Sequence, residues 1–164
     1  AARVDSETLM WRTLTTTTYT LTLDKFPSGN YIDLPRPPLQ SVTSLSYVDT
    51  AGDTQVMSSS LYVVTTDGEP GRIYLAYNES WPNIRQQRDA ITIVYKAGYG
   101  ATAATIPELI RHGVRLKVAH WYENREAVVI GTITSDLPIG IKRIDNLSKF
   151  RGTLNIYEDG LTQP

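Results

Sequence analysis

The residues of this sequence best suited to chemistry are two histidines, His112 and His120, which no cysteine accompanies. They lie eight residues apart in a segment with helical periodicity, so they share roughly one face two turns apart. Glu108 and Glu123 lie near them at helical spacing, and a carboxylate–histidine metal site is one interpretation. A divalent metal usually needs three or four converging ligands, and the segment has no His-Glu-x-x-His pattern. We therefore expect interfacial or half-buried polar groups here, with no metal and no other cofactor.

The sequence contains no other catalytic motif. No serine sits in a Gly-x-Ser-x-Gly elbow, and the lack of cysteine removes thiolate nucleophiles. Gly98-Tyr99-Gly100 lacks the third glycine of a dinucleotide-binding loop, which makes it a flexible joint between a strand and a helix. We predict that the protein is not an enzyme. An enzyme whose active site is assembled from scattered residues is the least favoured of the functions considered.

Two groups of charged residues bear on partners. One group alternates in sign along the predicted helix, where a solvated face and ion pairs between subunits are both open interpretations. Its members are Arg111, Arg115, Lys117 and Arg125 with Glu108, Glu123 and Glu126. The second group lies in 140–151, which contains one acidic residue, Asp145, and four basic ones: Lys142, Arg143, Lys149 and Arg151. This patch suits phosphates, an acidic partner surface or an ordinary helix end.

Composition limits the class of protein. The chain has 164 residues, 41% hydrophobic and 20% charged, which suits one packed domain or a core with an extended arm. The net charge of -1 and the pI of about 6.1 do not indicate a dedicated nucleic-acid binder. No apolar run is long enough to span a bilayer, and 1–12 shows no signal-peptide pattern, so we expect no membrane partner. The absence of cysteine suits assembly in a reducing cytoplasm.

The elements that position these residues fall into three regions. Residues 1–12 read as the end of a helix with Val4, Leu9 and Trp11 on its apolar side. Residues 13–100 read as β structure, with strands at 18–23, 39–48, 61–66, 73–77 and 91–95 separated by turn residues. In the first strand, Tyr19, Leu21 and Leu23 alternate with threonines. The same period of two recurs in two later strands, at Ile73, Leu75 and Tyr77 and at Ile91, Ile93 and Tyr95. The turns between short strands predict an antiparallel sheet or a small sandwich.

A helix is predicted to begin at Thr105-Ile106-Pro107-Glu108, which has the pattern of a capping box, and to run to about 127. Its apolar residues cover more than one stripe, and a helix that is apolar on two sides usually packs against two neighbours. One of those neighbours is expected to be another subunit. A shorter helix is predicted at 137–149, followed by an exposed tail at 152–164.

Five blocks of the sequence resemble a family of phage head–tail connector proteins. They occur in the family's order and span 34–127. They are Leu34-Pro-Arg-Pro-Pro-Leu-Gln-Ser-Val-Thr-Ser-Leu-Ser-Tyr-Val-Asp49, Glu69-Pro-Gly-Arg-Ile-Tyr-Leu75, Ala90-Ile-Thr-Ile-Val-Tyr-Lys-Ala-Gly-Tyr-Gly100, Ile106-Pro-Glu-Leu-Ile110 and Val118-Ala-His-Trp-Tyr-Glu-Asn-Arg-Glu-Ala127. The last block is the most specific of the five. Fewer residues precede the first strand than in the family, so either the helical core is reduced or the chain is incomplete at that end.

The resemblance implies an α+β fold in which an antiparallel β-rich insertion, about 13–100, sits on a small helical core with an extended C-terminal arm. A connector domain would cover 1–131, and 132–164 would hold the short helix and tail. Such proteins form a ring, commonly of twelve copies, beneath the portal protein at the head–tail junction of the virion. The ring extends the DNA channel and carries the neck and tail completion proteins, after assembly in the host bacterial cytoplasm. Lys142 and Arg143 are expected to contact the DNA in this channel through its phosphates, independently of sequence.

These implications assign expected contacts to named residues. Trp121, Tyr122 and Arg125 are expected to contact the next subunit of the ring, because aromatic and arginine anchors dominate interfaces. Burial of Trp121 and Tyr122 within one subunit is the alternative. A second set, Phe150, Leu154, Ile156 and Tyr157, is expected to dock onto the portal, where its alternation would add a strand to a partner sheet. The competing function is a β-rich tail or baseplate module that binds a surface glycan through exposed aromatics.

Overall fold

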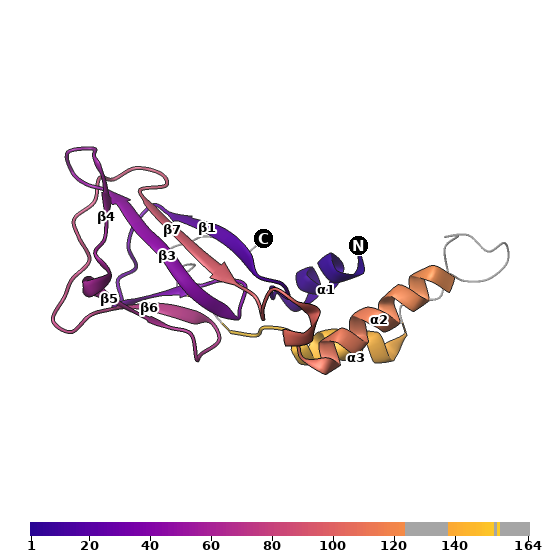
Figure 1. Ribbon diagram of the computed structural model, residues 1–164. Coiled ribbons are helices and arrows are strands. Elements are labelled where there is room, and N and C mark those ends of the chain that lie inside the picture. Colours follow the sequence, from indigo (N-terminus) through magenta and orange to yellow (C-terminus); the bar gives the residue numbers. More distant parts are fainter. Residues whose placement is uncertain (124–137, 153, 155–164) are drawn as a thin grey trace.

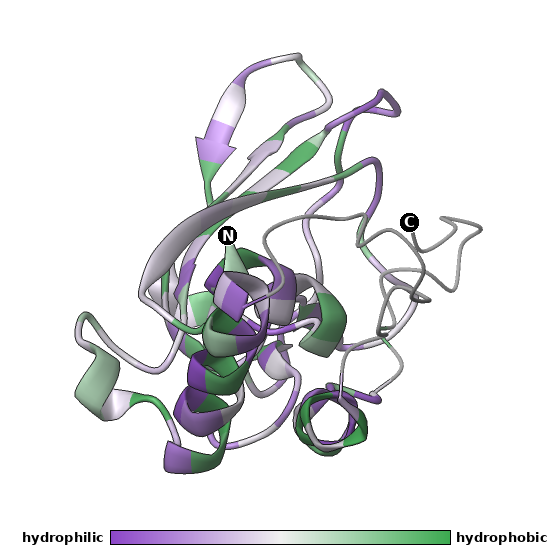
Figure 2. Ribbon diagram, turned by 90° about the vertical axis from the view of Figure 1, so that its right-hand side faces the viewer, coloured by the Kyte–Doolittle hydropathy of each residue, from purple (hydrophilic) through white to green (hydrophobic). Residues whose placement is uncertain are grey.

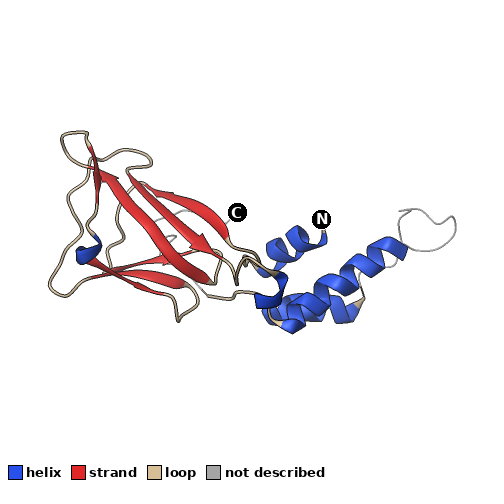
Figure 3. Ribbon diagram, viewed as in Figure 1, coloured by secondary structure: helices blue, strands red, loops and turns tan. Residues whose placement is uncertain are grey.

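The computed structural model describes residues 1–123, 138–152 and Leu154. Within these residues, seven strands lie at one end and three α-helices at the other (Figures 1 and 3). The strands are β1 Thr17–Leu23, β2 Tyr31–Leu34, β3 Leu39–Val48, β4 Thr54–Val56, β5 Tyr62–Thr65, β6 Gly71–Leu75 and β7 Ile91–Ala97. The helices are α1 Ala2–Met10, α2 Glu108–Glu123 and α3 Ile139–Ser148, with short 3₁₀ turns at Ser59–Leu61 and Ala103–Thr105. The predicted α+β class is confirmed.

The strands form two antiparallel sheets that share one core. The first sheet has the order β1-β7-β3-β4 and the second has the order β2-β6-β5. The central strand β7 buries Ile91, Ile93, Tyr95 and Ala97, and the second sheet contributes fully buried side chains such as Ile73 to the same cluster. The β end is therefore a small sandwich whose interior is filled from both sheets.

Period-2 alternation identified the central strands correctly. Tyr19, Leu21 and Leu23 point inward while the intervening threonines are exposed, and the predicted strand at 39–48 has the observed bounds. Two short strands, β2 and β4, were missed because neither is long enough to show a period. Tyr77 was wrongly placed on the inner face of a strand: β6 ends at Leu75, and Tyr77 is 99% exposed.

The three helices form a module beside the sandwich. α2 contacts both α1 and α3, and α2 approaches α3 closely at Gly113, where an added Cβ would lie 2.7 Å from Cγ2 of Ile144. A second, smaller core joins Met10, Leu14, Ile106 and Ile110 between α1 and the start of α2. The predicted short helix at 137–149 is confirmed as α3, whereas residues 124–127 of the long helix lie outside the described part of the chain.

Two details of the helices differ from the prediction. α1 buries Ala2, Ser6 and Met10 rather than Val4 and Leu9, both of which are exposed. The buried face of α1 meets the smaller core through Met10 and the buried charge of Lys117 on α2 through Ser6. The capping box is replaced by a different start: the Thr105 hydroxyl donates to the Thr102 carbonyl, and Glu108 pairs with arginines instead of reaching back. The Pro107 carbonyl accepts the first helical bonds.

Candidate functional site

Arg12 joins the sandwich to the helical module. Its guanidinium makes a two-pronged ion pair with Glu69 of the β5–β6 turn, with both N···O distances 2.5 Å. The same group donates to the Ser148 carbonyl at the end of α3 and to the Tyr99 hydroxyl. Burial by itself lowers the pKa of Arg12. The hydrogen bonds and the charge interactions that Arg12 makes with Glu69 and Tyr99 outweigh burial, and the pKa of Arg12 is raised. Burial raises the pKa of Tyr99. The junction therefore fixes how the two ends of the subunit are held.

Lys117 ties the three helices together at a single buried charge. Its side chain is completely buried, and Nζ donates to Asp5 Oδ2 at 2.8 Å, Ser6 Oγ at 2.9 Å and Asp145 Oδ2 at 2.9 Å. The three acceptors come from α1 and α3, and they match the three donors of an ammonium group. The prediction that Lys117 belongs to a solvated face or to an inter-subunit ion pair is wrong. Lys117 lies on the same face of α2 as buried Ile110 and Gly113.

The remaining surface of α2 carries exposed apolar side chains on two opposite sides. One side, the leucine flank, consists of Leu109 and Leu116, 49% and 37% exposed. The other side, the valine flank, consists of Val114, Val118 and Tyr122, of which Val118 and Tyr122 are 53% and 67% exposed. Successive residues of a helix are about 100° apart, so the two flanks lie on either side of the buried face. The helix is apolar on two sides, as its sequence predicted.

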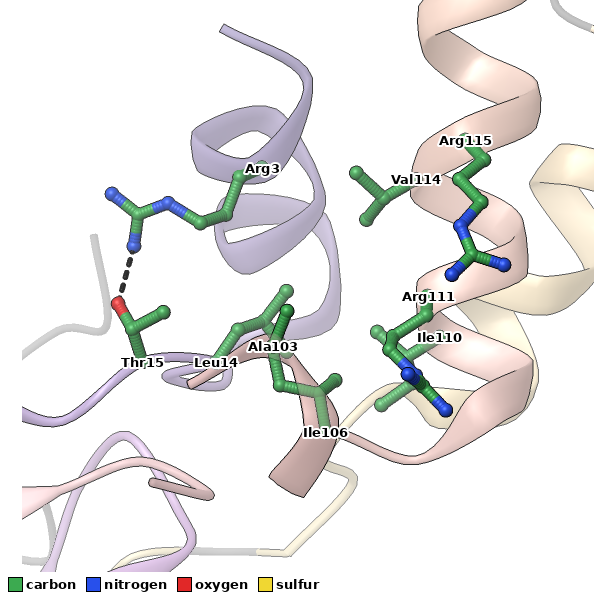
Figure 4. A pocket seen from close by; sticks show the side chains of 9 residues that line it. All are labelled: Arg3, Leu14, Thr15, Ala103, Ile106, Ile110, Arg111, Val114 and Arg115. Atoms are coloured by element: carbon green, nitrogen blue, oxygen red, sulfur yellow. Dashed lines mark hydrogen bonds between the residues drawn. The ribbon is translucent and has the colours of Figure 1, made fainter. Parts of the chain in front are cut away.

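A groove between α1 and α2 continues the valine flank toward the sandwich. It has a volume of about 250 Å³ and a floor of Leu14, Ile106, Ile110 and Val114. Three arginines border it: Figure 4 shows Arg111 and Arg115 reaching along the α2 side, while Arg3 lies across the groove and bonds Thr15. Arg111 and Arg115 pair with Glu108, and the buried Nε of Arg111 has no hydrogen-bond partner within the described residues. A leftover donor beside an apolar floor suits a partner with both apolar and acceptor groups.

The expected ring contacts are placed at the far end of α2. Tyr122 is exposed and Trp121 is 36% exposed, so neither is a core residue of the single subunit. Arg125 lies outside the described residues. In Figure 2 the ribbons of the helices carry both hydrophobic and hydrophilic residues along their length.

Two of the four expected portal contacts are core residues instead. Phe150 stacks on Trp11 with ring centroids 6.2 Å apart, and its N–H donates to the Met10 carbonyl. Leu154 is completely buried in the core of the sandwich. The expectation of an exposed tail from residue 152 is thus wrong at Leu154. Ile156 and Tyr157 lie outside the described residues.

The candidate DNA contacts, Lys142 and Arg143, are both exposed on α3. Asp145, the acid closest to them in sequence, is turned inward to Lys117 and leaves the basic groups of this segment on the surface. Arg143 lies between Ile139 and Leu147, which are 85% and 67% exposed, one helical turn to either side. The outer face of α3 is consequently basic and apolar together.

The two histidines do not meet as a metal site. His112 is exposed and His120 half-buried, and no group of three or more metal-ligating side chains converges among the described residues. None of the helices in the described ranges is long and apolar enough to cross a membrane.

The aromatic side chains at the far end of the sandwich contact each other. The rings of Phe26 and Trp81 stack with centroids 4.7 Å apart, and the Trp81 indole N–H donates to the Gly29 carbonyl.

Sequence reasoning missed Arg12 and the acceptors of Lys117. Each is an ordinary charged residue at a position whose partners lie far away in the sequence, Glu69 for Arg12 and Asp145 for Lys117. The only available signal was that Lys117 falls at the helical spacing of Ile110 and Gly113.

The chain thus has an α+β fold with a sandwich at one end, helices at the other and exposed apolar flanks on α2. No protein-family model and no curated protein matches the chain. Solved structures share the fold over 93% of this chain with a TM-score of 0.74. They are chains in the neck of an empty gene transfer agent particle computed with C6 symmetry, 24% identical with 75% of that chain covered, and in the virion of the native particle, 23% identical with 75% covered. A third is in the neck of the native particle computed with C12 symmetry, 22% identical with 80% covered.

Proposed function

We propose that this protein is a non-enzymatic neck component of a tailed phage or phage-derived particle, a connector subunit that forms a ring at the head–tail junction. The observation that carries the proposal is the pair of apolar flanks on α2. A ring subunit joins its neighbours head to tail, so it needs two different surfaces on opposite sides. The likeness of fold to neck chains of the gene transfer agent particle supports the same role, and the C6 and C12 symmetries of those structures suit a ring of twelve.

In this proposal the portal protein lies above the ring and a neck or tail completion protein lies below it. Trp121, Tyr122 and Arg125 contact the next subunit. Because Phe150 and Leu154 are held in the core, portal contact is proposed only for Ile156 and Tyr157, and the two buried residues anchor the arm. Lys142 and Arg143 supply sequence-independent contact with DNA phosphates in the channel.

Size-exclusion chromatography with light scattering, followed by negative-stain imaging, tests the proposal on the full chain. A closed ring, or a monomer that forms rings when purified portal is added, is the expected result. A monomer that forms no ring under either condition overturns it.

The glycan-binding alternative makes the opposite prediction, a monomer that binds sugars on a glycan array. The stacking of Phe26 on Trp81 and the indole hydrogen bond to Gly29 occupy aromatic surface that a sugar-binding platform would present.

A further inference from the structure

We propose that α2 of one copy packs directly against α2 of the next copy, with the leucine flank of one helix against the valine flank of its neighbour. This inference deepens the proposed ring and rests on it. It assigns a role to Leu109 and Leu116, and it makes the groove beside Arg111 part of the contact between copies.

The position of the exposed apolar side chains on α2 is the first argument. Leu109 and Leu116 are seven residues apart and lie on one line along the helix, while Val114, Val118 and Tyr122 repeat every four residues on the other side. Leu116 and Val118 are about 200° apart around the helix. The two flanks thus face nearly opposite directions, which is what a head-to-tail contact through one helix requires.

The polar residues of α2 give the second argument. The buried face holds Ile110, Gly113 and Lys117, and the face opposite to it is polar, with Glu108, His112 and Arg115 exposed. α2 therefore has one buried side, one solvated side and two apolar sides between them. Helices that form a closed wall have this pattern, because each is covered laterally by two copies of itself and exposes only its outer surface.

The groove supplies complementarity for the leucine flank. Its apolar floor lies beside Val114 and accepts an aliphatic side chain such as Leu109 of the neighbouring copy. The groove also borders Arg111, whose Nε is buried without a hydrogen-bond partner among the described residues. A buried donor without a partner is unfavourable, so an acceptor brought by the neighbouring copy would favour the contact.

Cysteine cross-linking tests the pairing, since the chain has no cysteine of its own. The double variants Leu116→Cys/Val118→Cys and Leu109→Cys/Val114→Cys place one thiol on each flank, with offsets along the helix axis of about 3 Å and about 7.5 Å. In rings under oxidising conditions, at least one double variant should give a ladder of covalent oligomers on non-reducing gels. The corresponding single variants should give no ladder, because each flank meets the other flank and not itself. Rings that form normally while neither double variant cross-links overturn the inference.

A second measurement uses charge insertion. Leu116→Asp and Leu109→Asp should each abolish rings while the chain stays folded, as measured by circular dichroism. The matched change Leu147→Asp, on the outer face of α3, should leave rings intact. Rings from both α2 variants, or loss of rings from Leu147→Asp as well, contradict the α2–α2 contact. If the wild-type chain forms no ring even with portal, the proposed function itself has failed, which separates the two outcomes.

Discussion

Replacing Lys117 with methionine tests whether one buried charge holds the helical module together. Methionine matches the apolar stem of lysine from Cβ to Cε and removes the ammonium group, with its three hydrogen bonds to Asp5, Ser6 and Asp145. The two carboxylates then lose their cation. The Asp145 side chain is only 10% exposed and has little access to water, whereas that of Asp5 is 40% exposed and can be hydrated.

The size of the effect follows from this asymmetry. Removing one partner of a buried ion pair costs about 3–5 kcal/mol, mostly because the remaining charge stays buried. Since Asp5 is partly hydrated, we expect the low end of that range, about 3 kcal/mol. For a chain of this size each kcal/mol lowers Tm by roughly 2–4 °C, so Tm should fall by about 6–12 °C.

Urea unfolding followed by circular dichroism measures the loss, at a concentration where the subunit is monomeric, because ring contacts would add to the apparent stability. Lys149→Met, an exposed lysine exchanged in the same way, should change the free energy of unfolding by less than about 0.5 kcal/mol. Lys117→Met/Asp145→Leu should recover most of the loss, because replacing a whole buried pair with apolar groups is often neutral. A loss below about 1 kcal/mol for Lys117→Met, or no recovery in the double variant, refutes the reasoning.

Three further predictions concern the junction and the arm. Arg12→Met should lower the free energy of unfolding by about 1.5–3 kcal/mol in the same urea assay, and Arg12→Lys should restore little because lysine lacks the two-pronged geometry that Glu69 uses. Phe150→Ala should cost about 3–5 and Leu154→Ala about 2–5 kcal/mol; an unchanged Tm would show that these side chains serve as surface anchors instead. The pKa of Tyr99 is raised by burial, so the folded state holds this proton more tightly than the unfolded state, and stability should fall as pH rises above about 10. Tyr99→Phe should flatten that fall in Tm between pH 9 and 11, and equal slopes in both proteins would contradict it.

The periodic pattern of apolar residues was enough to locate the longer strands and the helix α2. Alternation in 18–23 and 91–95 placed the central strands because a strand buried on one face must repeat every two residues. The two apolar sides of 108–123 were visible for the same kind of reason, since helical spacing assigns each residue to a side. The strands β2 and β4 were missed because three or four residues contain too little of a period.

The sequence by itself thus determined the α+β class, the two-sided helix α2 and the lack of a recognisable catalytic motif. Only the tertiary structure decided which polar groups are buried. In the sequence Lys117 and Asp145 resemble ordinary surface charges, but in the structure they are buried where α1, α2 and α3 meet. Phe150 resembles an exposed anchor in the sequence, but in the structure it stacks on Trp11. The physical reason is that burial of a charge depends on partners supplied by distant segments, whereas periodicity depends only on neighbours along the chain.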